Sequence, residues 1–214
     1  MDINIVYIDD GIDPELSRYL DEVLPSSLAE KQTKKRLGDI AVSYREIVYV
    51  PGSGFEQLLA NPLLQKANIA IIDSKLFETK TSAKEMLTGE EFLIILKKYY
   101  PFIESIVISQ IESRRNEEPL ILPKWNRIDY PNTDPADFYA EQLLPKICES
   151  IASIRAYRRA SAKLSTDTVD EVTIEKLRNA IAGQQEYDEL TKSDIDAAIS
   201  YFEEVKKLVT DASR

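Results

Sequence analysis

Short apolar runs alternate with helical patterns along residues 1–150, and this alternation is the feature that most constrains the fold. The clearest run, 68–73, is apolar at successive positions, which is typical of a strand buried on both faces of a sheet. Helical patterns separate it from four other strand-like runs, at 3–8, 46–50, 103–109 and 120–122. Alternating strands and helices favour a parallel sheet with helices on both faces, and right-handed crossovers make it doubly wound. We therefore expect an α/β domain with a five-stranded parallel sheet.

Aspartate and proline residues mark where helices should begin. Asp13 precedes Pro14, and Asp134 precedes Pro135; a carboxylate N-cap followed by proline at the first helical position is typical of a helix start. We expect the first of these helices to end near residue 24, with a partly helical or loose polar stretch at 25–43. Proline breaks helices, so the helical pattern at 55–67 is expected to split at Pro62.

The chain changes character near residue 146. From there on it shows helical patterns alone, at about 146–163, 169–182 and 193–210. Residues 1–150 carry 17 basic and 25 acidic side chains, a net charge of −8, whereas residues 151–214 carry 10 and 12, a net charge of −2. We expect two parts, an α/β domain at 1–150 and a helical appendage at 151–214 that serves dimerisation, partner docking or output.

Composition removes several classes of function. The chain has no histidine, which excludes Ser-His-Asp and Cys-His catalysis and nearly all zinc sites. A single cysteine, Cys148, allows no intrachain disulfide, so we expect a cytoplasmic protein. The net charge of −10 repels phosphate backbones and anionic membranes, so we expect neither nucleic acid nor a membrane as partner.

Arginine and lysine residues form one basic stripe at helical spacing, comprising Arg155, Arg158, Arg159 and Lys163. Tyr157 is the one aromatic residue within it, and no helix-turn-helix accompanies it. We expect the stripe to face solvent or the acidic α/β domain.

Charged and hydroxyl residues stand at the carboxyl ends of the predicted strands. Asp9 and Asp10 end the first strand, Asp73 the third and Ser109 the fourth, while Lys124 follows the fifth. In a doubly wound sheet, ligands bind outside these strand ends, where the strand order reverses. Clustered carboxylates select a hard metal ion such as Mg²⁺, and a carboxylate is also able to accept a phosphoryl group.

This pattern resembles the receiver domain of bacterial two-component response regulators. That family has an acidic pair after its first strand, a lone aspartate after the third, serine or threonine after the fourth and lysine after the fifth. Two segments are also similar to the family's, namely Ala70-Ile71-Ile72-Asp73 and Gly89-Glu90-Glu91-Phe92-Leu93. The resemblance covers about residues 2–150 and implies a flavodoxin-like, receiver-type fold.

The resemblance also implies a role for each residue. Asp73 would be the phosphoacceptor, Lys124 would pair with a phosphoryl oxygen, and Ser109 would be the switch hydroxyl. Mg²⁺ would be held by Asp9, Asp10, Asp73 and the backbone carbonyl of Lys75. Because the chain has no histidine, the phosphoryl group would come from a histidine kinase or another phosphodonor in trans.

Three functions stay open from the sequence. The first is a phosphorylated receiver that passes its signal to a partner, or to a second copy of itself, through residues 146–214. The second is a pseudo-receiver, an adaptor or oligomerisation module that is not phosphorylated; Trp125 at a position where the family has proline, and Ile121 in place of its aromatic switch residue, favour it. The third is a Mg²⁺-dependent phosphatase or hydrolase. Such an enzyme would need a further acid or base near Asp73, for example an aspartate two residues on, but residue 75 is lysine.

Overall fold

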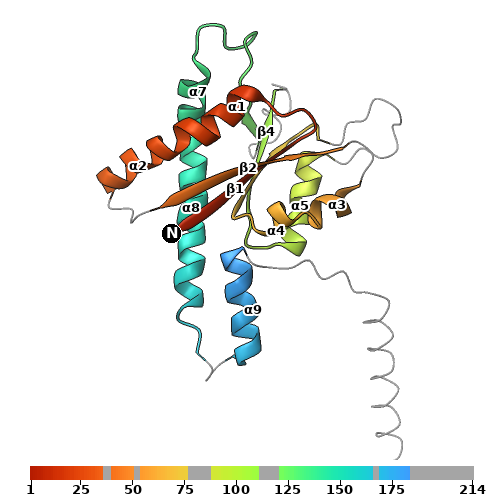
Figure 1. The fold of residues 1–214 in the computed structure, drawn as a ribbon, viewed down its shortest axis with the longest axis vertical. Helices are drawn as coiled ribbons and strands as arrows, with labels where there is room; N and C mark the ends of the chain where they lie inside the picture. Colours follow the sequence, from red (N-terminus) through yellow and green to blue (C-terminus); the bar gives the residue numbers. More distant parts are fainter. Residues whose placement is uncertain (36–39, 51–53, 77–87, 111–120, 166–168, 184–214) are drawn as a thin grey trace, which may run out of the picture.

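The sheet has the strand order that defines the fold class. This computed structural model describes residues 1–35, 40–50, 54–76, 88–110, 121–165 and 169–183. Within them, five parallel strands form one sheet in the order β2-β1-β3-β4-β5 (Figure 1). Their bounds are β1 Asp2–Asp9, β2 Ala41–Val48, β3 Ile69–Asp73, β4 Glu104–Ser109 and β5 Ile121–Pro123. This order is that of the flavodoxin-like doubly wound fold. The predicted fold class is therefore confirmed.

Strand β2 begins earlier than the sequence predicts. We expected it at 46–50, but it runs from Ala41 and pairs with β1 along its whole length. As an edge strand, β2 buries Tyr44 and Ile47 while Ser43 and Arg45 stay exposed. Its amino-terminal half therefore lacks the apolar run that marks a buried strand.

The first helical segment is longer than expected. It consists of α1 Pro14–Arg18, a π-helical turn η1 Tyr19–Val23, and α2 Leu24–Lys35, which extends away from the sheet (Figure 1). Asp13 caps α1 as predicted, accepting hydrogen bonds from the N–H groups of Glu15 and Leu16. Leu24 and Leu28 are buried four residues apart, so α2 continues the packing of α1 despite its polar composition.

Short helices cover one face of the sheet. As expected, Pro62 separates two of them, α3 Phe55–Leu59 and α4 Pro62–Gln65. They are followed by α5 Gly89–Tyr99, which begins with a capping box formed by Thr88 and Glu91.

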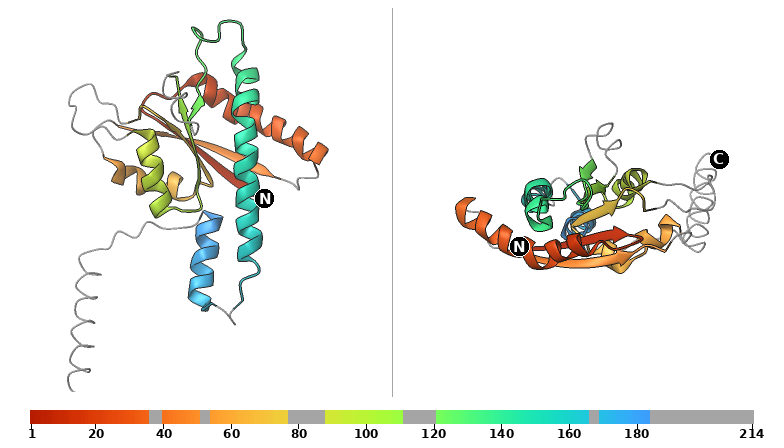
Figure 2. Two further views of the ribbon diagram at one scale, coloured as in Figure 1. Left: turned by 180° about the vertical axis from the view of Figure 1, so that it is seen from behind. Right: turned by 90° about the horizontal axis from the view of Figure 1, so that it is seen from above.

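The other face is covered by the first helical segment together with α7 Pro135–Gln142 and α8 Leu144–Ser161, and α9 Glu171–Ala182 packs beside α8 (Figure 2). The proposed boundary at residue 150 falls inside α8, and Ile147, Ile151 and Ile154 pack in the same core cluster. The helix expected at 193–210 lies outside the described residues. Among the helices that are described, none is long and apolar enough to span a bilayer.

Strand alternation assigns the side chains of β1 to two separate cores. Ile3, Ile5 and Tyr7 point toward α1, α7 and α8, whereas Val6 and Ile8 point toward α3, α4 and α5. Asp9 follows Tyr7 by two positions and therefore lies on the same face of the sheet as Tyr7. This places the first predicted site residue on the side of the long helices.

Candidate functional site

The predicted site residues occupy the carboxyl edge of the sheet. Asp9 ends β1, Asp73 ends β3, Ser109 ends β4, and Lys124 directly follows β5. The strand order reverses between β1 and β3, so Asp9 and Asp73 flank the topological switch point, the usual position of a ligand in this fold. We call Asp9, Asp73 and Lys124 with their immediate partners the carboxyl-edge site.

Lys124 joins the two aspartates. Its Nζ lies 2.7 Å from Asp9 Oδ2 and 3.0 Å from Asp73 Oδ1. The three residues are only 2% (Asp9), 7% (Asp73) and 6% (Lys124) exposed. Desolvation opposes burying a charge, whereas the ammonium between the two carboxylates compensates part of their charge.

The pKa values reflect this competition between burial and pairing. Burial raises the pKa of Asp73, and this effect outweighs the lowering by the positive charge of Lys124. For Lys124 the balance is opposite: burial lowers its pKa, but the charges of Asp73 and Asp9 raise it overall. The ammonium therefore stays charged at neutral pH.

Backbone groups fix the two carboxylates. Asp9 Oδ1 accepts the N–H of Gly11 at 2.9 Å, and Asp73 Oδ2 accepts the N–H of Lys75 at 2.9 Å. Asp10 is exposed, beyond the end of β1. Its pKa is raised by lost hydration, by a hydrogen bond with Asp9 and by the charges of Asp9 and Asp73. The edge thus carries more negative charge than Lys124 neutralises.

Tyr7 is a member of the site that sequence reasoning missed. Its hydroxyl donates a hydrogen bond to Asp9 Oδ2, and Lys124 Nζ lies 5.7 Å from the centre of its ring. Tyr7 is 0% exposed, and burial followed by the charge of Asp9 raises the pKa of its phenol strongly, so the phenol remains a proton donor. The sequence signal was the i, i+2 spacing that places Tyr7 and Asp9 on one face of β1.

Ser109 lies beside the residue after Asp73. Asp73 pairs with Ile108 in the sheet, so Ser109 is level with Ser74, whose hydroxyl donates to Ser109 Oγ at 2.8 Å. Both serines are buried. The structure thus brings Ser109 to the edge of the site, where its hydroxyl engages Ser74.

Gly89 lets α5 start directly against the site. A Cβ at this position would lie 2.4 Å from the carbonyl oxygen of Asp73 and 2.9 Å from Cα of Ser74. The Gly89 N–H donates to the Ser74 carbonyl at 3.1 Å. Only glycine allows this approach, which fixes the backbone that carries the Asp73 side chain.

Trp125 makes a contact that proline could not make. Its backbone N–H donates to the hydroxyl of Tyr139 at 3.2 Å, and its indole Nε1 donates to the carbonyl of Thr133 at 3.1 Å. Proline has no N–H to donate. Tyr139 is buried in α7 and thereby contacts Trp125, the residue that follows Lys124. Tyr139 was not singled out from the sequence.

The predicted Mg²⁺ ligands are suitable in kind, because carboxylate and carbonyl oxygens suit that ion. Within the residues that the structure describes, however, no three acidic or cysteine side chains are placed to hold a metal ion together. The Lys124 ammonium lies between Asp9 and Asp73, and Asp10 is exposed. The residues do not fit the metal in this arrangement, and Mg²⁺ binding stays a prediction.

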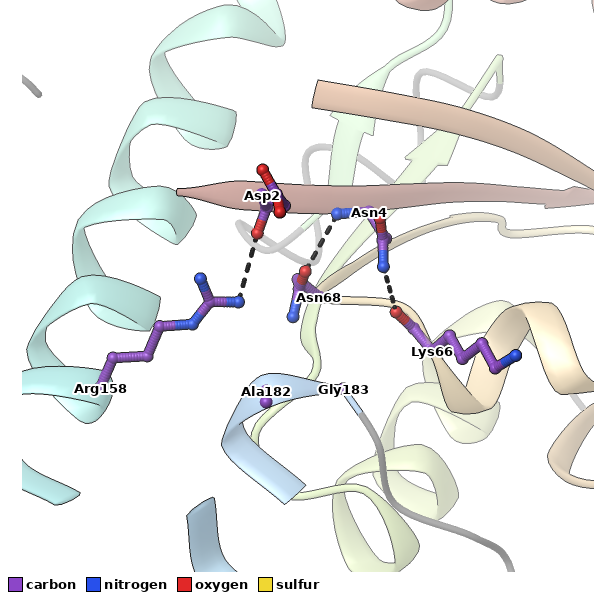
Figure 3. Close-up of a pocket in the computed structure, with 7 residues that line it drawn as sticks. All are labelled: Asp2, Asn4, Lys66, Asn68, Arg158, Ala182 and Gly183. Atoms are coloured by element: carbon purple, nitrogen blue, oxygen red, sulfur yellow. Dashed lines mark hydrogen bonds between the residues drawn. The ribbon is translucent and has the colours of Figure 1, made fainter. Parts of the chain in front are cut away.

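A polar cavity of about 530 Å³ lies at the opposite, amino edge of the sheet (Figure 3). Its lining combines the start of β1, the residues before β3, helix α8 and the end of α9: Asp2, Asn4, Lys66, Asn68, Arg158, Ala182 and Gly183. We call this the amino-edge cavity.

Hydrogen bonds among the lining groups join the elements around the amino-edge cavity. Asn68 Oδ1 accepts the N–H of Asn4 at 3.0 Å, and Asn4 Nδ2 donates to the Lys66 carbonyl at 2.9 Å. Arg158 donates to the Asp2 carbonyl at 3.2 Å, so this member of the basic stripe binds the backbone of the α/β domain (Figure 3). These bonds tie α8 and the start of β3 to β1.

Comparisons with known proteins add little to this geometry. No protein-family model matches the chain, and no curated protein matches its sequence. A solved structure of the two-component response regulator RcsB in complex with DNA is similar at 14% identity, with a TM-score of 0.32, covering 89% of this chain and 95% of that one. A TM-score of this size carries no argument, so the fold assignment rests on the strand order.

Proposed function

We propose that this chain is a receiver-type signalling protein that accepts a phosphoryl group on Asp73. The observation that supports this function best is the position of Lys124 Nζ, within 3.0 Å of both Asp73 and Asp9 at the switch point of the sheet. An acceptor carboxylate with an adjacent ammonium is what phosphoryl transfer requires of a protein, because its catalysis is mostly positioning and charge neutralisation.

The transfer is a substitution at phosphorus. An Asp73 carboxylate oxygen attacks the phosphorus of the donor, the bond between phosphorus and the donor's leaving atom breaks, and an acyl phosphate forms on Asp73. The leaving group keeps the electron pair of the broken bond. Lys124 then pairs with one phosphoryl oxygen. The Ser109 hydroxyl gives up its hydrogen bond with Ser74 and binds a second phosphoryl oxygen. The donor is a histidine kinase or a small phosphodonor in trans.

The proposal includes Mg²⁺, which Asp9, Asp10, Asp73 and the backbone carbonyl of Lys75 would hold once the Lys124 ammonium no longer lies between the two aspartates. When bound, it would supply further neutralisation of charge at the acceptor. The ion pair between Lys124 and Asp73 and the hydrogen bond between Ser74 and Ser109 are made by the chain alone.

The helical region is the proposed output. A shift of Lys124 toward a phosphoryl group moves Trp125, whose N–H is bonded to Tyr139 of α7. Helix α7 leads into α8 through Leu143, and α9 packs on α8. This chain of contacts supports a signal that reaches a protein partner, or a second copy of the chain, through residues 146–214.

A non-phosphorylated adaptor is the second candidate, and burial favours it. Asp73 is 7% exposed, and its two oxygens already accept hydrogen bonds from Lys124 and from the N–H of Lys75. In this case the ion pairs would hold the fold together, and the helices would carry the binding function.

Intact-mass measurement separates the two candidates. The wild-type protein is incubated with acetyl phosphate, once with Mg²⁺ and once with a chelator, beside the variants Asp73→Asn and Ser109→Ala. The receiver function predicts a mass gain of one phosphoryl group in wild type and Ser109→Ala, and none in Asp73→Asn. No gain in any sample, with the proteins folded by circular dichroism, would support the adaptor.

A further inference from the structure

We propose that Tyr7 holds the carboxyl-edge site in a state that binds divalent cations weakly, by occupying Asp9 with its hydroxyl. The inference rests on the proposed function only for the assignment of Asp9 as a ligand of Mg²⁺. It adds to the two obstacles already described, the Lys124 ammonium between the aspartates and the exposed position of Asp10.

The hydrogen-bonding capacity of Asp9 is nearly used up. An ionised carboxylate offers about four acceptor positions on its two oxygens. Asp9 Oδ2 accepts both the Tyr7 hydroxyl and Lys124 Nζ, and Oδ1 accepts the N–H of Gly11. The hydrogen bond between Asp9 and Asp10, one of the causes of the raised Asp10 pKa, falls on the same carboxylate.

Asp73 is less occupied than Asp9. Its carboxylate accepts one hydrogen bond from Lys124 and one from the N–H of Lys75. Two of its roughly four acceptor positions are therefore taken, against at least three on Asp9. A divalent cation that approaches this edge meets its main competition at Asp9.

The Tyr7 hydroxyl cannot easily give up Asp9. Tyr7 is fully buried and its ring packs in the core among residues of α1, α7 and α8, so its position is set by the strand and not by a free rotamer. A cation that took Asp9 Oδ2 would leave a buried hydroxyl without a partner, at a cost of about 1–3 kcal/mol. That cost opposes cation binding.

Tyr7→Phe removes this competition without changing the net charge. The ring stays in the core, Lys124 keeps both aspartates, and one acceptor position on Asp9 Oδ2 becomes free. The expected result is an affinity for Mg²⁺ about tenfold tighter than in wild type, the scale of one hydrogen bond to a charged group.

A matched control is available in the same core. Tyr19 is also buried, and its hydroxyl has no hydrogen-bond partner within the described part of the chain. Tyr19→Phe therefore removes an equivalent oxygen from the same core cluster without touching Asp9. Its Mg²⁺ affinity is expected to equal that of wild type, and a tenfold change in it would overturn the inference.

Trp125 provides the readout. It is the single tryptophan of the chain and follows Lys124 directly. Mg²⁺ is titrated into wild type, Tyr7→Phe and Tyr19→Phe at constant ionic strength without any phosphodonor, and tryptophan fluorescence and the shift of Tm with Mg²⁺ are recorded. Tyr7→Leu repeats the test in case Tyr7→Phe does not fold.

Each outcome bears on one proposal. Tighter Mg²⁺ binding in the Tyr7 variants alone supports the inference, and equal binding in wild type and both Tyr7 variants overturns it. The phosphoryl adduct is measured separately. Tighter Mg²⁺ binding without an adduct on wild type would count against the proposed function alone, whereas an adduct with equal Mg²⁺ affinities would count against the inference alone.

Discussion

The two edges of the sheet are stabilised in different ways. At the carboxyl edge, buried charges balance one another, with Lys124 between Asp9 and Asp73. At the amino edge the bonds use side-chain amides and backbone groups, with Asn68 joined to Asn4, and the one charged donor, Arg158, binds a neutral backbone carbonyl, that of Asp2. Both edges connect elements that are distant in the sequence.

The difference indicates where the molecule is able to respond to a ligand. The amino-edge hydrogen bonds end on neutral acceptors and are satisfied in one arrangement. Three buried charges, in contrast, change their balance when a cation or a phosphoryl group arrives, because electrostatic interactions are stronger in a buried, low-dielectric site. The amino edge is thus a fixed connection to α8, and the carboxyl edge is the responsive one.

Replacing Lys124 by methionine is expected to give the largest effect. Lys124→Met leaves two buried carboxylates without their counter-ion, and breaking a buried pair in this way costs about 3–5 kcal/mol in the free energy of unfolding. Urea unfolding of wild type and variant at neutral pH measures the difference.

The amino edge offers the control for this prediction. Arg158→Met removes one hydrogen bond to the Asp2 carbonyl from a half-exposed side chain, at an expected cost of about 1 kcal/mol. Equal costs for Lys124→Met and Arg158→Met would remove the distinction between the two edges.

Gly89→Ala is expected to be the next most destabilising change. The added Cβ would lie 2.4 Å from the Asp73 carbonyl oxygen, so the start of α5 or the end of β3 must move. Such overpacking costs about 1–3 kcal/mol. Thermal unfolding measures the loss, with Gly11→Ala as the matched variant, since a Cβ there meets nothing within 4 Å. A loss in Gly11→Ala as large as in Gly89→Ala would contradict the explanation.

Gly183→Ala tests the amino edge in the same way, with a smaller expected loss. Gly183 ends α9 at φ +76°, and a Cβ would lie 2.9 Å from the Lys66 carbonyl. The left-handed conformation alone costs a non-glycine residue about 1–2 kcal/mol. Tm is expected to fall while Mg²⁺ binding, read from Trp125, stays as in wild type. A changed Mg²⁺ affinity would show that the two edges are coupled.

Asp10→Asn gives the smallest effect, visible in its dependence on pH. The raised pKa of Asp10 means that the folded protein keeps this proton to a higher pH than the unfolded chain. Its contribution to the free energy of unfolding therefore falls as pH rises above about 4. Asp10→Asn is expected to match wild type near pH 3 and to be slightly more stable than wild type at pH 7. Urea unfolding at both pH values checks this, and a difference that is independent of pH would contradict it.

The sequence predicts the carboxyl edge better than the amino edge, for a physical reason. Strand ends in a parallel sheet share one edge, so the places of Asp9, Asp73 and Lys124 follow from the order of strands and helices alone. The bond between Asn68 and Asn4 links residues 64 positions apart and leaves no local pattern. Arg158 was visible as part of a stripe, but its partner, a backbone carbonyl, has no sequence signature.

Tyr7 was missed, and α2 was predicted only as a partly helical or loose stretch, for two different reasons. A tyrosine in an apolar strand looks like a core residue, which Tyr7 also is, and its hydroxyl contact with Asp9 appears only when the i, i+2 spacing is considered. The α2 segment looks polar and only partly helical in the sequence because Leu24 and Leu28 are the buried residues among 24–30, the part of α2 whose side chains the structure describes. In both cases the decisive interaction is a tertiary contact and not a local preference.

Chemical mapping of the acceptor tests the central claim most directly. Wild-type protein is treated with acetyl phosphate, reduced with borohydride, which converts an aspartyl phosphate into homoserine, and digested for peptide mass spectrometry. Phosphoryl transfer to Asp73 predicts homoserine at position 73 and nowhere else in the chain. An unmodified Asp73, in a sample where an established receiver protein treated in parallel is converted, would contradict the claim.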